Sequence, residues 1–161
     1  MEDKQKYRCP SLAVDIIIQC LKPNGDAGYV FIERKNPPHG IAIPGGFVDY
    51  GESLYDAAVR EAKEEVSLDV CLTRQLFAYS HPQRDPRQHV VSVAFLATAV
   101  GEPKAADDAK NVVWVKETDI GDWLDDSKER LVCDHYYVLE DLLKLDCGTT
   151  RYLSPTIEDC R

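Results

Sequence analysis

The sequence predicts a single α/β domain in which a mixed β-sheet lies between layers of helices. Apolar runs rich in Val and Ile stand before and after one amphipathic stretch at about 53–66, which predicts strands on both sides of an internal helix. A second amphipathic stretch, at 127–145, predicts a terminal helix. The length of 161 residues suits one domain, and no repeat, low-complexity tract or linker divides it.

The first half of the chain is predicted to begin the sheet. Ser11–Leu21 is rich in Val and Ile, which favour strands. Turn-forming residues follow at 22–26, so a hairpin with the next strand is expected. Pro37 and Pro38 indicate a loop over 35–40. The expected strands and short extended pieces of this half are 11–21, 28–34, 41–43 and 47–48.

One helix is predicted in the middle of the chain. Ser53 is a suitable N-cap, and apolar residues recur after it at helical spacing until about residue 66. This stripe predicts that one face of the helix is apolar. Its members are Leu54, Ala57, Ala58, Ala62 and Val66.

The second half is predicted to complete the sheet and to end in a helix over 127–145. Strands are expected at 68–79, 89–100 and 111–115. Polar loops are expected at 80–88 and 101–110, with a short turn or helix near 118–123 and a weakly patterned tail from 146 onward. The terminal helix is indicated by three- and four-residue steps between Leu131, His135, Val138, Leu142 and Leu145.

Composition restricts the classes of partner. The formal net charge is −9, and an acidic protein repels a phosphate backbone, so a nucleic-acid polymer is not expected as a partner. No apolar run reaches the roughly 18 residues that span a membrane. Residues 1–10 lack the order of a secretory signal, so a cytoplasmic location is expected.

The cysteines do not indicate a metal site or a disulfide framework. No two of them stand at the two-to-four residue spacing of a zinc site, and no secretory signal accompanies them. They are expected to be small core residues or spectators. The six are Cys9, Cys20, Cys71, Cys133, Cys147 and Cys160.

The chemistry is expected on the central helix. Glu61, Glu64 and Glu65 stand at i, i+3 and i+4, which projects three carboxylates onto one helix face. Each such pair of like charges costs roughly a few tenths of a kcal/mol, which a bound Mg²⁺ or Mn²⁺ would offset. Gly45 and Gly46 could offer backbone carbonyls to that ion, because glycine permits close approach. The alternative interpretation is a solvated acidic face.

The segment 46–68, GFVDYGESLYDAAVREAKEEVSL, resembles the Nudix box. It departs from the box at Ser67, where the family has a glycine, and leaving the helix there with serine costs about 1 kcal/mol. The resemblance implies one Nudix hydrolase domain over residues 1–161 with an α/β/α sandwich fold. The matching residues are Gly46, Glu52, Arg60, Glu61, Ala62, Glu64, Glu65 and Leu68.

The resemblance also implies a ligand set for Mg²⁺ or Mn²⁺. Glu61, Glu64 and Glu65 would bind the cations, helped by the backbone carbonyl of Gly45 or Gly46. Cations in this position neutralise a diphosphate and acidify a water molecule that attacks phosphorus.

The implied catalytic residues are Arg60, Glu64 and Glu65. Arg60 would orient the glutamates, and Glu52 would pair with it or reach a metal through water. Glu64 is our first choice for the general base. The second choice is a loop acid, because some relatives carry a late acidic ligand in the loop where Asp107 and Asp108 stand here. A solvated loop is the alternative for those two.

Two flanking segments narrow the substrate. Two segments resemble the ADP-ribose pyrophosphatases of the family: ERKNPPHGIAIPGGFVDYGES and YSHPQRDPRQHVVSVAF. The pair Asp134-His135 also resembles a pair in these relatives. The alternative is that this pair is simply a helix position packed on the sheet. Guanidinium groups suit phosphate oxygens. Tyr79 or Phe47 would either stack on a base or, as we favour, pack in the core. The expected substrate-binding residues are Arg34, Arg84, Arg87 and His89.

Three functions remain open on the sequence. The first is Mg²⁺-dependent cleavage of ADP-ribose to AMP and ribose 5-phosphate. The second is a Nudix hydrolase for a nucleoside triphosphate or another nucleotide-sugar. The third is a nucleotide-sensing module without catalysis, against which the retained Arg60, Glu61, Glu64 and Glu65 argue. The ADP-ribose relatives are commonly dimers, so a homodimer is an implication of the resemblance.

Overall fold

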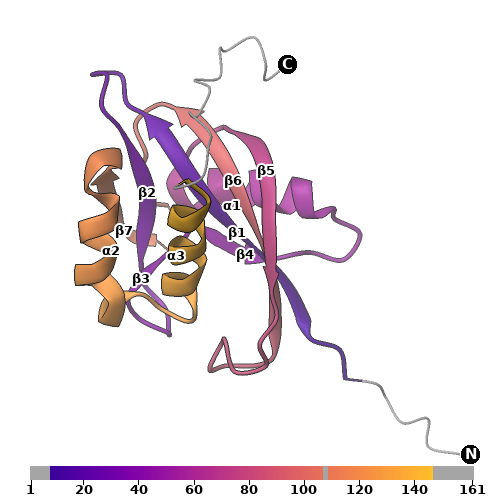
Figure 1. The fold of residues 1–161 in the computed structure, drawn as a ribbon. Coiled ribbons are helices and arrows are strands. Elements are labelled where there is room, and N and C mark those ends of the chain that lie inside the picture. The colour runs from indigo at the N-terminus through magenta and orange to yellow at the C-terminus, as the bar shows by residue number, and fades with distance from the viewer. Residues whose placement is uncertain (1–7, 107–108, 147–161) are drawn as a thin grey trace, which may run out of the picture.

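The computed structural model describes residues 8–106 and 109–146. Within them, one mixed sheet lies between α1 on one face and α2 and α3 on the other (Figure 1). The strands are β1 (Ser11–Leu21), β2 (Ala27–Arg34), β3 (Ile41–Ala42), β4 (Gly45–Phe47), β5 (Val70–Tyr79), β6 (Val90–Val100) and β7 (Ala109–Lys116). The α-helices are α1 (Leu54–Val66), α2 (Ile120–Ser127) and α3 (His135–Asp146).

The sheet is built around β1. This strand pairs antiparallel with β2, as the turn chemistry predicts, and parallel with β6 along its whole length from Ser11 to Leu21. The strand order is β3-β2-β1-β6-β5, with β4 also paired to β1 and β7 to β2. The predicted mixed sheet between helices is therefore confirmed.

Alternation along the strands explains both helical layers. On β1, Val14, Ile16 and Ile18 point to the side of α1, whereas Ile17 packs with the residues of α2 and α3. Successive side chains of a strand point to opposite faces of the sheet. A strand with apolar side chains on both faces therefore requires helices that cover both faces.

The central helix forms as its sequence predicts. The Ser53 hydroxyl caps it by accepting from the Asp56 N–H at 3.1 Å. At its end Ser67 takes the left-handed conformation, with φ of 59°, and its N–H donates to the Lys63 carbonyl. Serine here performs the turn that glycine makes more easily.

Several boundaries differ from expectation, and the pairing of the backbone explains two of them. The predicted helix over 127–145 is wrong in its first part, because Leu131 forms a parallel bridge with Ile41, and Val132 N–H donates to the Ile41 carbonyl. This long-range pairing pulls the chain out of helix until α3 starts at His135. The extended piece expected at 47–48 begins earlier, because the backbone of Gly45 pairs with β1. None of the described helices combines the length and apolar character needed to cross a bilayer.

Candidate active site

Two adjacent glycines let β4 approach the end of α1. The Gly45 N–H donates to Glu65 Oε2 at 2.8 Å. A Cβ at Gly46 would overlap the Glu61 carboxylate, and one at Gly45 would overlap the Val14 carbonyl. Glycine is required at both positions, and the result is that two helix carboxylates reach the backbone of the loop.

Arg60 organises the acidic residues around this contact. Its Nε and Nη2 donate to the two oxygens of Glu52 at 2.8 and 2.9 Å. Its Nη1 donates to Glu61 at 2.7 Å and to Glu64 at 3.0 Å. Hydrogen bonds from Arg60 lower the pKa of Glu52 to about 2, whereas burial raises the pKa of Glu61. Of the two roles that the resemblance implies for Glu52, the pairing with Arg60 is present in the structure.

The three glutamates of the helix do not face the same way. Glu61 and Glu65 line a cavity, but Glu64 lies outside its lining, with its side chain 46% exposed and bound by Arg60. Among the described residues, no three His, Cys, Asp or Glu side chains form a ready-made metal site. The structure thus brings together two of the three predicted carboxylates, and Glu64 has to leave Arg60 before it can join them.

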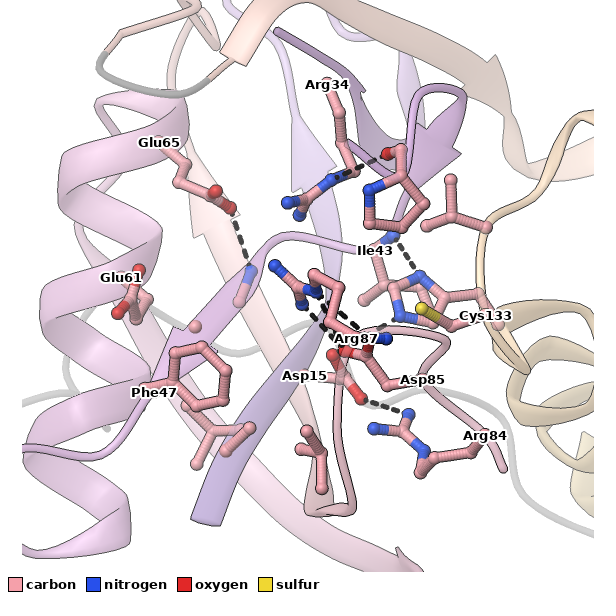
Figure 2. Close-up of a pocket in the computed structure, with 18 of the residues that line it drawn as sticks. Asp15, Arg34, Ile43, Phe47, Glu61, Glu65, Arg84, Asp85, Arg87 and Cys133 are labelled. Atoms are coloured by element: carbon pink, nitrogen blue, oxygen red, sulfur yellow. Dashed lines mark hydrogen bonds and ion pairs between the residues drawn. The ribbon is translucent and has the colours of Figure 1, made fainter. Parts of the chain in front are cut away.

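The cavity beside these glutamates has a volume of about 320 Å³ (Figure 2). Sites for small molecules typically measure about 300–1,000 Å³. Acidic and basic side chains from distant parts of the chain meet in it, which suits an anionic ligand together with a cation. These acidic and basic lining residues are Asp15, Asp49, Glu61, Glu65, Asp85, Arg34, Arg60, Arg84, Arg87 and His135.

The predicted substrate-binding residues are placed very differently. Arg34 lines the cavity, and its Nε donates to the Pro38 carbonyl at 3.1 Å, while its two Nη groups make no hydrogen bond to any described residue. Arg87 also lines the cavity but is paired with Asp85. His89 is exposed and outside the lining, with Nε2 3.3 Å from the Ser80 carbonyl.

Arg84 is the centre of a buried polar network. Its side chain is 4% exposed, and its Nε and Nη2 contact both oxygens of Asp134 at 2.9 and 2.6 Å. Nη2 also contacts Asp15 at 3.2 Å, and the Ser92 hydroxyl donates to the same carboxylate at 2.6 Å. Because Asp15 and Asp134 already occupy Arg84, its guanidinium joins β1 to the segment before α3 at the wall of the cavity.

His135 extends this network to the glycine loop. The Ile43 N–H donates to its Nδ1 at 2.9 Å, so the ring proton lies on Nε2, which is 3.6 Å from Asp15. Burial lowers the pKa of His135; nearby Arg84 and Arg34 also lower it, while Asp15 and Asp134 raise it. The folded protein therefore holds a neutral imidazole.

We expect stability to fall when the pH drops below about 6.5, the ordinary pKa of histidine. The unfolded chain then takes up a proton at His135 that the folded chain refuses, so the free energy of unfolding decreases by up to about 1.4 kcal/mol per pH unit. Urea denaturation at pH 7 and pH 5.5 measures this. His135→Gln, which keeps an acceptor for Ile43, should lose most of that dependence, and an unchanged slope in this variant would contradict the assignment.

Sequence reasoning missed three of the acids in the cavity, Asp15, Asp49 and Asp85. Asp15 is the only charged residue in the apolar run Ser11–Leu21, and that interruption was a signal of a buried partner. Asp85 stands two residues before Arg87 in the predicted polar loop 80–88, and the resemblance of that loop to the relatives gave this acid no role. The suggested late acids Asp107 and Asp108 lie outside the described residues.

The two aromatic candidates separate. Tyr79 packs against the cluster of α2 and α3 and donates to Asp141 at 3.2 Å, so it belongs to the core as favoured. Phe47 was expected in the core by the same argument, but it is 40% exposed and lines the cavity. That expectation is wrong, because Phe47 belongs to neither apolar cluster and its ring lies in the cavity lining.

Comparison with known proteins gives consistent matches. A family model described as the NUDIX domain matches residues 12–141. An ADP-ribose pyrophosphatase from Methanocaldococcus jannaschii is 38% identical over 152 residues, covering 91% of this chain and 82% of the relative. An ADPR-responsive transcriptional repressor, NtrR, from Acinetobacter baylyi is 32% identical over 98 residues, covering 58% of this chain and 39% of the repressor.

A solved structure has the same fold. It is a bifunctional NMN adenylyltransferase/ADP-ribose pyrophosphatase from Francisella tularensis, complexed with AMP and a manganese ion, with a TM-score of 0.74 and 26% identity. The match covers 90% of this chain and 44% of that one. The chain therefore spans less than half the length of this protein and of the repressor.

Proposed function

The chain belongs to the NUDIX family and is a Nudix hydrolase, and from that premise we propose that it hydrolyses the pyrophosphate bond of ADP-ribose to give AMP and ribose 5-phosphate. The observation that carries the proposal is the contact of Glu61 and Glu65 with the Gly45-Gly46 loop inside a cavity of ligand size. The similarity to an ADP-ribose pyrophosphatase over nearly the whole chain supports this substrate.

The donor groups fit a hard divalent cation, Mg²⁺ or Mn²⁺. Glu61 and Glu65 would hold it together with a backbone carbonyl of Gly45 or Gly46. Mg²⁺ is commonly bound by one or two carboxylates, with water and substrate phosphates completing its shell, so two cavity carboxylates suffice. When bound, the ion supplies charge neutralisation at the diphosphate and lowers the pKa of a water molecule. The manganese ion in the Francisella tularensis protein supports this choice.

The protein's own residues would then position the diphosphate and receive a proton. Arg34 has two Nη groups without partners among the described residues, and these would donate to phosphate oxygens. Water would attack one phosphorus, the bridging P–O bond would break, and a carboxylate would take the proton of the water. Glu64 remains our choice for that carboxylate, provided that it turns from Arg60 toward the cavity; Asp107 or Asp108 is the second choice.

A second function is favoured by a specific relative. The similarity to a repressor that responds to ADP-ribose suggests a module that binds the same nucleotide without cleaving it. Binding and catalysis are separable, because a sensor needs Arg34 but has no need of the Arg60 network around Glu61 and Glu64.

A substrate panel tests the proposal. We expect purified protein with Mg²⁺ or Mn²⁺ to show its highest kcat/KM on ADP-ribose, with AMP and ribose 5-phosphate identified as products by chromatography. ATP, dGTP and a hexose-linked nucleoside diphosphate serve as competitors. If a triphosphate is cleaved and ADP-ribose is not, the substrate assignment is wrong. If ADP-ribose binds without turnover, the chain is a sensor.

A further inference from the structure

Arg87 is held in an unusual way for a phosphate-binding residue. Its Nε lies 3.0 Å from Asp85 Oδ1 and its Nη2 lies 2.7 Å from Asp85 Oδ2, so one carboxylate occupies a full edge of the guanidinium. Asp85 is itself buried, with its side chain 4% exposed, and it also accepts from the backbone N–H of Arg87. The edge that would form a fork with phosphate is therefore occupied, and the charge of Arg87 is largely neutralised.

The flat face of Arg87 is what remains available. Its guanidinium carbon lies 5.8 Å from the centre of the Phe47 ring, over the face of that ring. Phe47 lies in the cavity lining instead of either apolar cluster. Figure 2 shows Arg87 between Phe47 and Asp85, with Glu61 and Glu65 on the neighbouring helix. The Arg87 guanidinium thus lies over the face of the Phe47 ring in the cavity lining.

We propose that Phe47 and Arg87 form a stacking slot for the nucleobase of the substrate, with Asp85 as the residue that positions Arg87. This proposal rests on the proposed function, because it assumes a nucleotide substrate. Carbon atoms in van der Waals contact are about 3.5 Å apart, so a base between two planes needs roughly 7 Å. The gap has to widen by about 1 Å, which the half-exposed side chain of Arg87 can allow.

The slot also places the base relative to the reaction. Phe47 directly follows Gly46, whose backbone lies against Glu61, so a base on Phe47 lies next to the proposed cation site. Stacking recognises the flat face that all bases share, and only Nη1 of Arg87 is left without a partner among the described residues. The slot should thus favour a nucleotide over a bare sugar phosphate.

Binding of AMP and of ribose 5-phosphate to the full chain tests the slot. With Mg²⁺ held constant, calorimetry should show that Phe47→Ala weakens the binding of AMP by about tenfold or more, the size expected for one lost base–aromatic stack. The binding of ribose 5-phosphate should weaken by less than about twofold. Arg87→Lys keeps the charge but loses the flat face, so it should weaken AMP by about fivefold or more. Phe77→Ala changes a phenylalanine that is 49% exposed and lies outside the cavity, and it should change neither binding constant.

Three outcomes would overturn the slot. They are unchanged AMP binding in Phe47→Ala, parallel losses of AMP and ribose 5-phosphate, or full AMP binding in Arg87→Lys, which would make Arg87 a simple charge. Circular dichroism of each variant excludes misfolding as the cause of a loss. The result is separable from the proposed function: Phe47-dependent AMP binding in a protein that leaves ADP-ribose intact supports the slot and refutes the hydrolysis.

Discussion

Replacing Glu65 with glutamine should lower kcat for ADP-ribose by about 100-fold or more while the protein remains folded. Glutamine has nearly the same shape, and its side-chain oxygen can still accept from the Gly45 N–H, as Glu65 does at 2.8 Å. What is lost is a negative charge at the proposed cation site. A metal ion contributes several kcal/mol of transition-state stabilisation, and each 1.36 kcal/mol corresponds to about tenfold in rate. Steady-state kinetics at saturating Mg²⁺ and thermal denaturation measure the two quantities.

Controls on other glutamates make this result specific. Glu140→Gln removes a carboxylate from α3 that pairs with Lys144 on the surface, and it should leave kcat unchanged. Glu64→Gln tests the predicted base: a loss comparable with that of Glu65 places Glu64 in the reaction, whereas full kcat limits it to its contact with Arg60. Full activity of Glu65→Gln would refute the proposed role of the helix.

The sequence predicts best those helices and strands that are determined by the spacing of apolar residues within one segment. The Val- and Ile-rich run of β1 and the alanine stripe of α1 each determine an element through contacts within or beside it. The start of α3 was missed because its determinant is not local: Leu131 follows the helical period, but its pairing with Ile41, ninety residues earlier, forces an extended backbone. A pattern along one segment carries no information about such a partner.

The site divides in the same way. The box register predicts the neighbourhood of Glu61, Glu65 and the glycine loop, because side chains three and four residues apart share a helix face. The box register does not predict which carboxylate pairs with each arginine. Arg84 and Arg87 look alike in sequence. In the structure Arg84 is buried between Asp15 and Asp134, which come from distant parts of the chain, whereas Arg87 is paired with its neighbour Asp85. Arg84 meets its two carboxylates only because β1 and the segment before α3 pack against the loop before β6.

The buried position of Arg84 predicts the largest effect on stability. Replacing it with methionine, which is similar in length and uncharged, should reduce the free energy of unfolding by about 3–5 kcal/mol at pH 7. The loss comes less from the missing attraction than from the carboxylates of Asp15 and Asp134, whose side chains are only 10% and 17% exposed and would remain without the cation between them. Chemical denaturation measures the change.

A matched variant on the surface separates burial from charge. Lys110→Met also removes a cation from a carboxylate, but the side chains of Lys110 and Glu33 are 59% and 38% exposed, so the stability loss should be far smaller than for Arg84→Met. Asp15→Asn with Arg84→Met restores part of the loss if the unpaired carboxylate is its cause, because the amide carries no charge and can still accept from the Ser92 hydroxyl. Equal losses for Arg84→Met and Lys110→Met would show that the buried network does not determine stability, and Arg84 would then be better explained as a ligand of the substrate.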